Sequence, residues 1–338
     1  MVRSKWPNCG RRFSGSILCS SRELGIDVHV DSSDFKSSRS KILDPVYTGQ
    51  TGIRLNVQNG DDQMRRMEET APKYGSGGLR QELSARNLSR AGGFEHEVTY
   101  SRVPSVIYQE KDGTHGNFLD ASYRMICAHP EWRRRFEKRY TAGAIARRWE
   151  RSRGEMECAN SSDALLMNIV CYPRMMHRRE VCALLGLGVG EIPVFGYRAQ
   201  IPLKGGRVDR TEIDVLLGNV MVEAKLTETG FQTAPLRLIE RYRDLEEVFD
   251  IGSLPVRGEK VESYQLIRGV LAAHAQKRTF AVLCDGRRKD MIERWFQVLS
   301  AVQIYELRSR LKVLTWQELA KTLPVTVRKF LDEKYGIL

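Results

Sequence analysis

The stretch TEIDVLLGNVMVEAKL, residues 211–226, is apolar enough to be buried but contains four charged residues. A buried charge without a partner costs several kcal/mol, which is close to the net stability of a small domain. Gly218 and Asn219 both tolerate a positive φ angle, and together they predict a two-residue hairpin turn. If they form the turn, Leu217 pairs with Val220. The stretch is therefore predicted to be an antiparallel hairpin.

The register of this hairpin brings the four charges together. Counting outward from the turn, Asp214 lies opposite Glu223, and Glu212 lies opposite Lys225. Because side chains alternate along a strand, all four share one face of the hairpin. The other face is predicted to be core, and its residues are Ile213, Val215, Val222, Ala224 and Leu226.

Two of these charges predict a metal site. Directly opposed residues have Cβ atoms about 4.5–5.5 Å apart, so the carboxylates of Asp214 and Glu223 repel each other unless a cation lies between them. Such oxygen ligands suit Mg²⁺, which takes one or two protein carboxylates and completes its shell with water and substrate phosphate. Lys225 would stand beside the metal-bound water and orient it, help to deprotonate it, or hold a phosphate. Glu212 is either a further group of the site or, as we favour, the partner that holds Lys225.

Composition limits the class of protein. The 338 residues are 41% apolar and 28% charged, which is typical of a globular chain of one large or two ordinary domains. A net charge of +12 favours a polyanionic partner such as nucleic acid. No apolar run reaches the roughly 20 residues of a membrane helix, and the seven scattered cysteines are typical of reduced thiols. We expect a soluble cytoplasmic protein without a membrane partner.

The chain divides into three stretches. Residues 1–95 are rich in Ser, Gly, Arg and Asp, which predicts a mostly flexible arm. Residues 96–160 are predicted to be a basic helical segment. Residues 161–338 are predicted to be an α/β domain in the order helix, three-strand meander, helix, strand, helix. The first helix is expected to begin at Ser161 or Ser162, and residues 235–250 are expected to form one amphipathic helix.

The basic segment predicts a nucleic-acid contact. Between residues 133 and 153 there are nine basic and two acidic residues, interleaved with aromatic rings such as Trp132 and Phe136. Long cationic side chains reach phosphates while the rings pack inward; the alternative is a solvated helix face. The predicted contacts are Arg133, Arg134, Arg135, Arg139, Arg147 and Arg148, together with Arg268 from a later helix.

The pattern of Asp214 followed by Glu223-Ala224-Lys225, in this order of elements, resembles the PD-(D/E)XK nuclease superfamily with its restriction-endonuclease-like fold, including putative restriction endonucleases. The resemblance covers about residues 161–300 and more loosely the basic segment. It implies Mg²⁺-dependent hydrolysis of DNA by an endonuclease, with Mn²⁺ as a substitute. Asp214 and Glu223 would be metal ligands, the Ala224 carbonyl a further ligand, and Lys225 the catalytic lysine.

The sequence departs from this superfamily at one position and leaves another open. Ile213 stands where members usually have proline. Many members also carry an acid on the first helix, for which the candidates are Asp163, Glu180 and Glu191; Glu180 is included in the predicted catalytic set. Gln265 resembles a polar residue that many members place on the helix after the lysine, and it completes that set.

Other functions are also compatible with the sequence. The chain could be a catalytically inactive nucleic-acid-binding protein on the same fold, or a nuclease of DNA repair or recombination. It could also be an unrelated α/β enzyme that uses Glu223 and Lys225 as acid and base, and an exposed salt-bridge ladder on the hairpin is the simplest alternative. A restriction-type role in host defence follows from family analogy alone. DNA is the expected partner, and a homodimer is one option.

Overall fold

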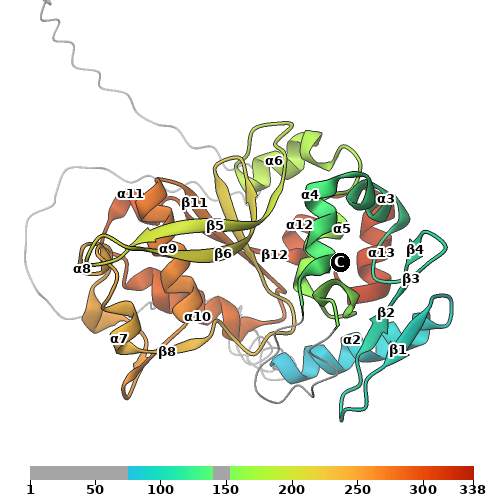
Figure 1. Ribbon diagram of the computed structural model, residues 1–338, viewed down its shortest axis with the longest axis horizontal. Coiled ribbons are helices and arrows are strands. Elements are labelled where there is room, and N and C mark those ends of the chain that lie inside the picture. Colours follow the sequence, from blue (N-terminus) through green and yellow to red (C-terminus); the bar gives the residue numbers. More distant parts are fainter. Residues whose placement is uncertain (1–74, 140–152) are drawn as a thin grey trace, which may run out of the picture. The chain divides into compact units, whose positions relative to one another are not determined.

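The computed structural model describes residues 75–139 and 153–338, which belong to one compact unit (Figure 1). The predicted arm up to residue 74 and the predicted contacts Arg147 and Arg148 lie outside the described residues. The fold combines helices with several sheets, so the predicted α/β class is confirmed. No described helix has the length and apolar content needed to cross a membrane. The five described cysteines are free thiols, as predicted.

A five-stranded sheet forms the centre of the unit, in the order β12-β11-β7-β6-β5. Its strands are β5 (Val194–Pro202), β6 (Val208–Leu217), β7 (Val220–Ala224), β11 (Thr279–Cys284) and β12 (Leu311–Thr315). Strands β5, β6 and β7 form an antiparallel meander, as expected from the sequence. Strand β11 then pairs in parallel with both β7 and β12. Strand β5 therefore lies at one edge of the sheet.

The hairpin of β6 and β7 has the predicted register. Leu217 pairs with Val220, and the next pairs are Leu216 with Met221 and Val215 with Val222. The ladder ends there, and the side chain of Asp214 accepts the backbone N–H of Ala224, the residue after Glu223. The turn uses the positive φ angle of Gly218, at 51°, because a glycine has no Cβ to oppose it.

Apolar residues cover both faces of the sheet, and Figure 1 shows the helices on its two sides. On one side α9 (Tyr264–Gln276) and α10 (Lys289–Ser300) share a core with Ile213 and Met221. On the other side α5 (Ser162–Val170), α12 (Trp316–Ala320) and α13 (Val325–Tyr335) share a core with the remaining residues of the predicted apolar face, Val215, Val222, Ala224 and Leu226.

Ile213 thus differs from its prediction, because it packs on the α9 side. Gly196 stands across from Asp214 in the β5–β6 ladder and has a φ angle of +62°, outside the range of an extended strand. We attribute the change of side to a bend of the two strands at this point.

The predicted helix over residues 235–250 is divided into α7 (Leu236–Ile239) and α8 (Leu245–Val248). The intervening residues pair with the end of β5 instead of continuing the helix. The N–H of Lys204 donates to the carbonyl of Arg241 at 2.8 Å, and the N–H of Arg243 donates to the carbonyl of Pro202 at 3.1 Å. Strand pairing therefore replaces one helical turn, which an apolar period cannot reveal.

Part of the predicted flexible arm is folded. Helix α2 (Ser76–Ala91) buries Leu79 and Leu83 completely, and it contacts α13. Its buried residues recur every fourth position within an otherwise polar stretch, so the mean composition hides a narrow apolar stripe.

The predicted helical segment 96–160 also contains two small hairpins. Trp132 is buried there, and its Nε1–H donates to the carbonyl of Pro193 at 3.0 Å. The elements of the segment are β1 (His96–Val98), β2 (Val106–Tyr108), β3 (Glu110–Lys111), β4 (Thr114–His115), α3 (Asp120–Ala128), α4 (Pro130–Arg133), η1 (Arg134–Glu137) and η3 (Glu155–Glu157). The remaining short elements are η4 (Met175–His177), α6 (Arg179–Leu185), β8 (Thr233–Pro235), η5 (Ile251–Ser253), β9 (Val256–Arg257), β10 (Lys260–Glu262) and α11 (Tyr305–Arg308).

Candidate active site

The predicted acidic pair lies where β6 separates from β7. The Oδ2 atom of Asp214 accepts a hydrogen bond from the backbone N–H of Ala224 at 2.8 Å. The next residue, Lys225, donates its N–H to the carbonyl of Leu283 in β11 at 2.8 Å. In an extended strand the N–H and C=O of one residue point to the same side. The carbonyl of Ala224 therefore points away from β11 and toward Asp214.

Glu223 connects β7 with α9. It is 1% exposed, and its Oε1 atom accepts hydrogen bonds from the Nζ of Lys225, at 2.5 Å, and from the Nε2 of Gln265 in the first turn of α9. Gln265 and Lys225 thus hold one carboxylate oxygen in place. Three residues predicted for the site therefore meet at one carboxylate oxygen, and Asp214 reaches the backbone between Glu223 and Lys225.

The electrostatics at this point match a site built for a cation. Burial raises the pKa of Asp214 well above its ordinary value, and the negative charges of Glu223 and Asp163 raise it further. Burial lowers the pKa of Lys225, but Glu223 and Asp214 outweigh burial, so that this pKa lies above its usual value. Lys225 is therefore a cation at neutral pH, whereas burial and the nearby carboxylates favour the neutral form of Asp214.

A second group of charges borders the site. The guanidinium of Arg135, which is 8% exposed, lies 2.9 Å from Asp163 Oδ2, 2.8 Å from Glu212 Oε1 and 3.8 Å from Asp214 Oδ1. Arg135 is thus enclosed by carboxylates instead of being presented to a phosphate, which corrects its predicted role. The partner of Glu212 is likewise Arg135 instead of Lys225.

Lys138 extends this group. Its Nζ lies 2.7 Å from Asp163 Oδ2, 3.1 Å from Glu155 Oε2 and 3.5 Å from Glu212 Oε1. Asp163 stands in the first turn of α5 behind the Ser161 cap, whose side chain accepts the N–H of Ala164. Of the three acids considered for the first helix, Asp163 is the one that the structure brings close to Asp214. Its carboxylate already forms ion pairs with Arg135 and Lys138.

Gly196 allows Arg135 to reach Glu212. A Cβ atom at this position would lie 2.7 Å from the Nη1 of Arg135. Its φ angle of +62° is also unfavourable for any residue with a side chain. Sequence reasoning missed this group, because Arg135 lies 28 residues before Asp163 and 77 before Glu212. No local period links residues so far apart.

Other predicted residues lie outside this arrangement. Glu180 is exposed on α6, and its ion pair is with Arg178 at 3.8 Å. Arg268 pairs with Asp209 at 3.1 Å and stacks over the ring of Tyr264. Of the basic segment, Arg133, Arg134 and Arg139 are exposed, and Arg134 pairs with a neighbouring glutamate at 2.9 Å.

The donor set fits a hard divalent cation. Among the described residues none donates a hydrogen bond to Glu223 Oε2 or Asp214 Oδ1, and the nearest cation to Asp214 Oδ1 is Arg135 at 3.8 Å. These two oxygens can take a metal ion together with the Ala224 carbonyl. Across the described residues there is no group of three or more His, Cys, Asp or Glu arranged for a metal. Two carboxylates agree with Mg²⁺, which is usually held by one or two.

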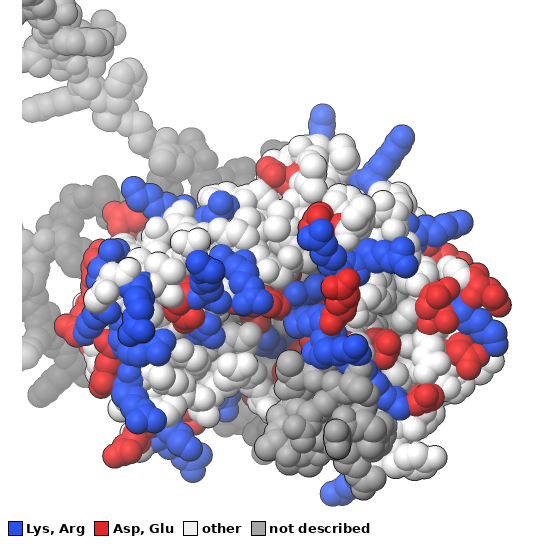
Figure 2. Space-filling view, viewed as in Figure 1, with Lys and Arg blue, Asp and Glu red and all other residues white. Residues whose placement is uncertain are grey.

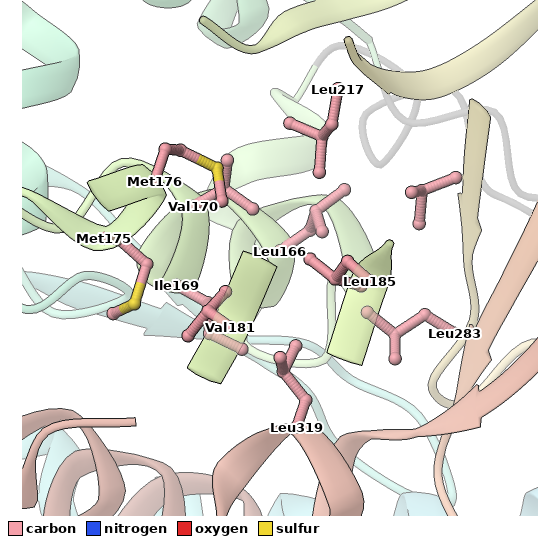
Figure 3. A pocket seen from close by; sticks show the side chains of 11 residues that line it. Leu166, Ile169, Val170, Met175, Met176, Val181, Leu185, Leu217, Leu283 and Leu319 are labelled. Carbon is pink, nitrogen blue, oxygen red and sulfur yellow. The ribbon is translucent and has the colours of Figure 1, made fainter. Parts of the chain in front are cut away.

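The cavity of Figure 3 lies elsewhere. It is lined by apolar side chains alone, among them Leu166 of α5, Leu185 of α6 and Leu283 of β11. These residues belong to the core on the α5 side of the sheet. The cavity therefore provides no polar group for chemistry, and the charged residues at the end of β7 remain the candidate site.

Comparison with known proteins gives one match. The sequence model of a family described as Restriction Endonuclease associating with ARP matches residues 94–336. The matched range contains every residue of the candidate site. No curated protein and no solved structure matches the chain.

Proposed function

This chain belongs to the family described as Restriction Endonuclease associating with ARP, and we propose that it is a Mg²⁺-dependent endonuclease that hydrolyses phosphodiester bonds in DNA. The observation that carries the proposal is the meeting of Asp214, Glu223 and Lys225 at the end of β7. The order α5, β5–β7, α9 and β11 supports a restriction-endonuclease-like core of the PD-(D/E)XK type.

The chain's own residues would divide the work as follows. Asp214, Glu223 and the Ala224 carbonyl would hold the ion. When bound, Mg²⁺ would supply a Lewis acid that polarises the phosphate and a bound water that is more acidic than free water. Lys225, as a cation, would hold the scissile phosphate and stabilise the negative charge that grows on it. Gln265 would keep Glu223 oriented through its hydrogen bond.

Cleavage of covalently closed circular DNA, with Mg²⁺ or with EDTA, tests this proposal. We expect the wild type to cut circles with Mg²⁺ and not with EDTA, because the site needs a divalent ion between its carboxylates. Asp214→Asn and Lys225→Met should each lower the rate at least about 100-fold, the usual loss when one group that stabilises the transition state is removed. Glu333→Gln, on the exposed face of α13, is the matched control and should cut normally.

The same assay separates the alternatives. A catalytically inactive DNA-binding protein would retain circles with every divalent metal, and this outcome would refute the nuclease. The intact Glu223–Lys225 contact favours activity. We also propose a restriction-type role in host defence with ARP as an associate, following the family description. Transformation by unmodified and modified plasmid DNA measures that role.

A further inference from the structure

The hairpin of β5 and β6 extends beyond the candidate site and presents one face outward. On β5, Ala199 and Ile201 are buried in the core shared with α9, so the alternate residue Arg198 points away from α9. On β6, Ile213 is buried in the same core, so Arg210 and Glu212 point outward. Arg207 is exposed in the turn that joins the two strands, and we call Arg198, Arg207 and Arg210 the arm surface.

Two of the three arginines of the arm surface carry positive charge that no described residue neutralises. Arg207 and Arg210 are exposed, and neither forms an ion pair with another described residue. The side chain of Arg198 is 66% exposed and lies 3.5 Å from Glu212. Figure 2 shows Lys and Arg side chains gathered over β5 and β6. Lys204, at the tip, is 3.6 Å from Glu246 and adds less.

Strand β6 connects this surface directly to the site. Arg210, Glu212 and Asp214 follow each other at two-residue intervals, so Arg210 lies about 13 Å from Asp214 along the strand. Glu212 between them is neutralised by Arg135 and Lys138 and does not repel a phosphate. Arg207 is about 23 Å from Asp214, the length of about seven base pairs of duplex DNA.

We propose that the arm surface binds the phosphate backbone of duplex DNA on one side of the bond that is cut. This inference rests on the proposed function for the place of the cut at Asp214. It assigns the backbone contact to β5 and β6 instead of the inward-facing Arg135 and Lys138. Contacts of this kind position the duplex without reading its bases.

Binding of a labelled duplex in EDTA, measured by fluorescence anisotropy over a range of salt, tests the surface without cleavage. Each of Arg198→Ala and Arg210→Ala should weaken binding about three- to tenfold and reduce the slope of log K against log salt by about one. Both effects should be independent of DNA sequence. Arg308→Ala is the matched control, because Arg308 is exposed on α11 beside Leu307 of the α9-side core. It should bind like the wild type.

Duplex length and cleavage separate the two proposals. On duplexes with fewer than about seven base pairs on one side of the cut, Arg207→Ala should bind with the wild-type affinity, because such a duplex no longer reaches Arg207. If the double variant Arg198→Ala/Arg210→Ala binds with the wild-type affinity and salt slope, the arm surface is wrong even if the enzyme cuts. If the arm variants weaken binding but the wild type never cuts, the nuclease fails and the surface stands.

Discussion

Arg135 is the residue that links the basic segment to the candidate site. It faces Asp163, Glu212 and Asp214 within 3.8 Å and is almost completely buried. A buried cation among carboxylates is costly to remove, because the carboxylates then remain buried without compensation. Arg135 therefore holds together three negative charges that would otherwise separate the segment from the sheet.

We expect Arg135→Ala to lower the free energy of unfolding by about 3–5 kcal/mol, the usual loss when one partner of a buried pair is removed. Urea unfolding measures it. Arg134→Ala, at the exposed neighbouring position, should stay within about 0.5 kcal/mol. Adding Asp163→Asn to Arg135→Ala should recover part of the loss, since contacting residues are not additive. Equal losses for both arginines would contradict the assignment.

Site residues whose contacts lie close in the sequence were predictable, and those with distant partners were not. The turn at Gly218 and Asn219 determines the register of β6 and β7, so the pairing of Val215 with Val222 followed from sequence. Gln265 came from a resemblance, and its contact with Glu223 supports it. Arg135 was predicted to bind phosphate because a run of basic residues does not show which of its side chains is buried. Tertiary partners decide that.

At the scale of elements, α13 docks on α2 through a buried lysine. Lys334 is fully buried; its Nζ donates to Asn87 Oδ1 at 2.7 Å and to the Ala159 carbonyl at 3.2 Å, and it stands between the rings of Tyr108 and Tyr335. No carboxylate of a described residue pairs with it. Burial, and next the charge of Arg90, lower the pKa of Lys334 well below its ordinary value of 10.5.

This lowered pKa makes stability depend on pH. Between the lowered value and 10.5 the unfolded chain binds a proton that the folded chain does not, so the contribution of Lys334 to the free energy of unfolding rises with pH. Lys334→Met removes this contribution. Its stability relative to the wild type should be most favourable at low pH and decline toward pH 10. Denaturant titrations at several pH values measure the trend, and Lys329→Met, exposed on the same helix, should show none.

Burial raises the pKa of Tyr108 and Tyr335 above their ordinary value of 10, so these rings alter stability only in more alkaline solution. Parallel curves for wild type and Lys334→Met below pH 10 would contradict the assignment. Helix α2 itself was not predicted, because its buried leucines are diluted by polar residues. Long periodic elements such as α9 and α10 were predicted, since their apolar stripes are wide.

At the scale of the whole molecule, the boundary predicted near residue 160 does not separate independent domains. Phe118, Trp132 and Met156 pack in one cluster with Ala164 and Met167 of α5. The leucines of α2 belong to the core on the α5 side of the sheet. Composition changes at this boundary, but the apolar contacts cross it.

A chain that begins at residue 161 should therefore fail to fold cooperatively. It would expose the partners of Leu79 and Leu83, each worth about 1.5–3 kcal/mol, from a total of about 5–15 kcal/mol. Near-ultraviolet circular dichroism and limited proteolysis measure this. A chain that begins at residue 75 keeps these contacts and should unfold cooperatively. Cooperative unfolding of the shorter chain would restore the boundary.

The two-residue turn of the β6–β7 hairpin has a consequence for inheritance. A substitution at Gly218 or Asn219 changes the free-energy cost of forming the turn. An insertion or deletion of one residue instead shifts the register and moves every side chain of one strand to the other face. The length of the eight-residue segment between Asp214 and Glu223 is therefore more constrained than the identity of its residues. Homologous chains should therefore tolerate substitutions within the hairpin but not insertions or deletions.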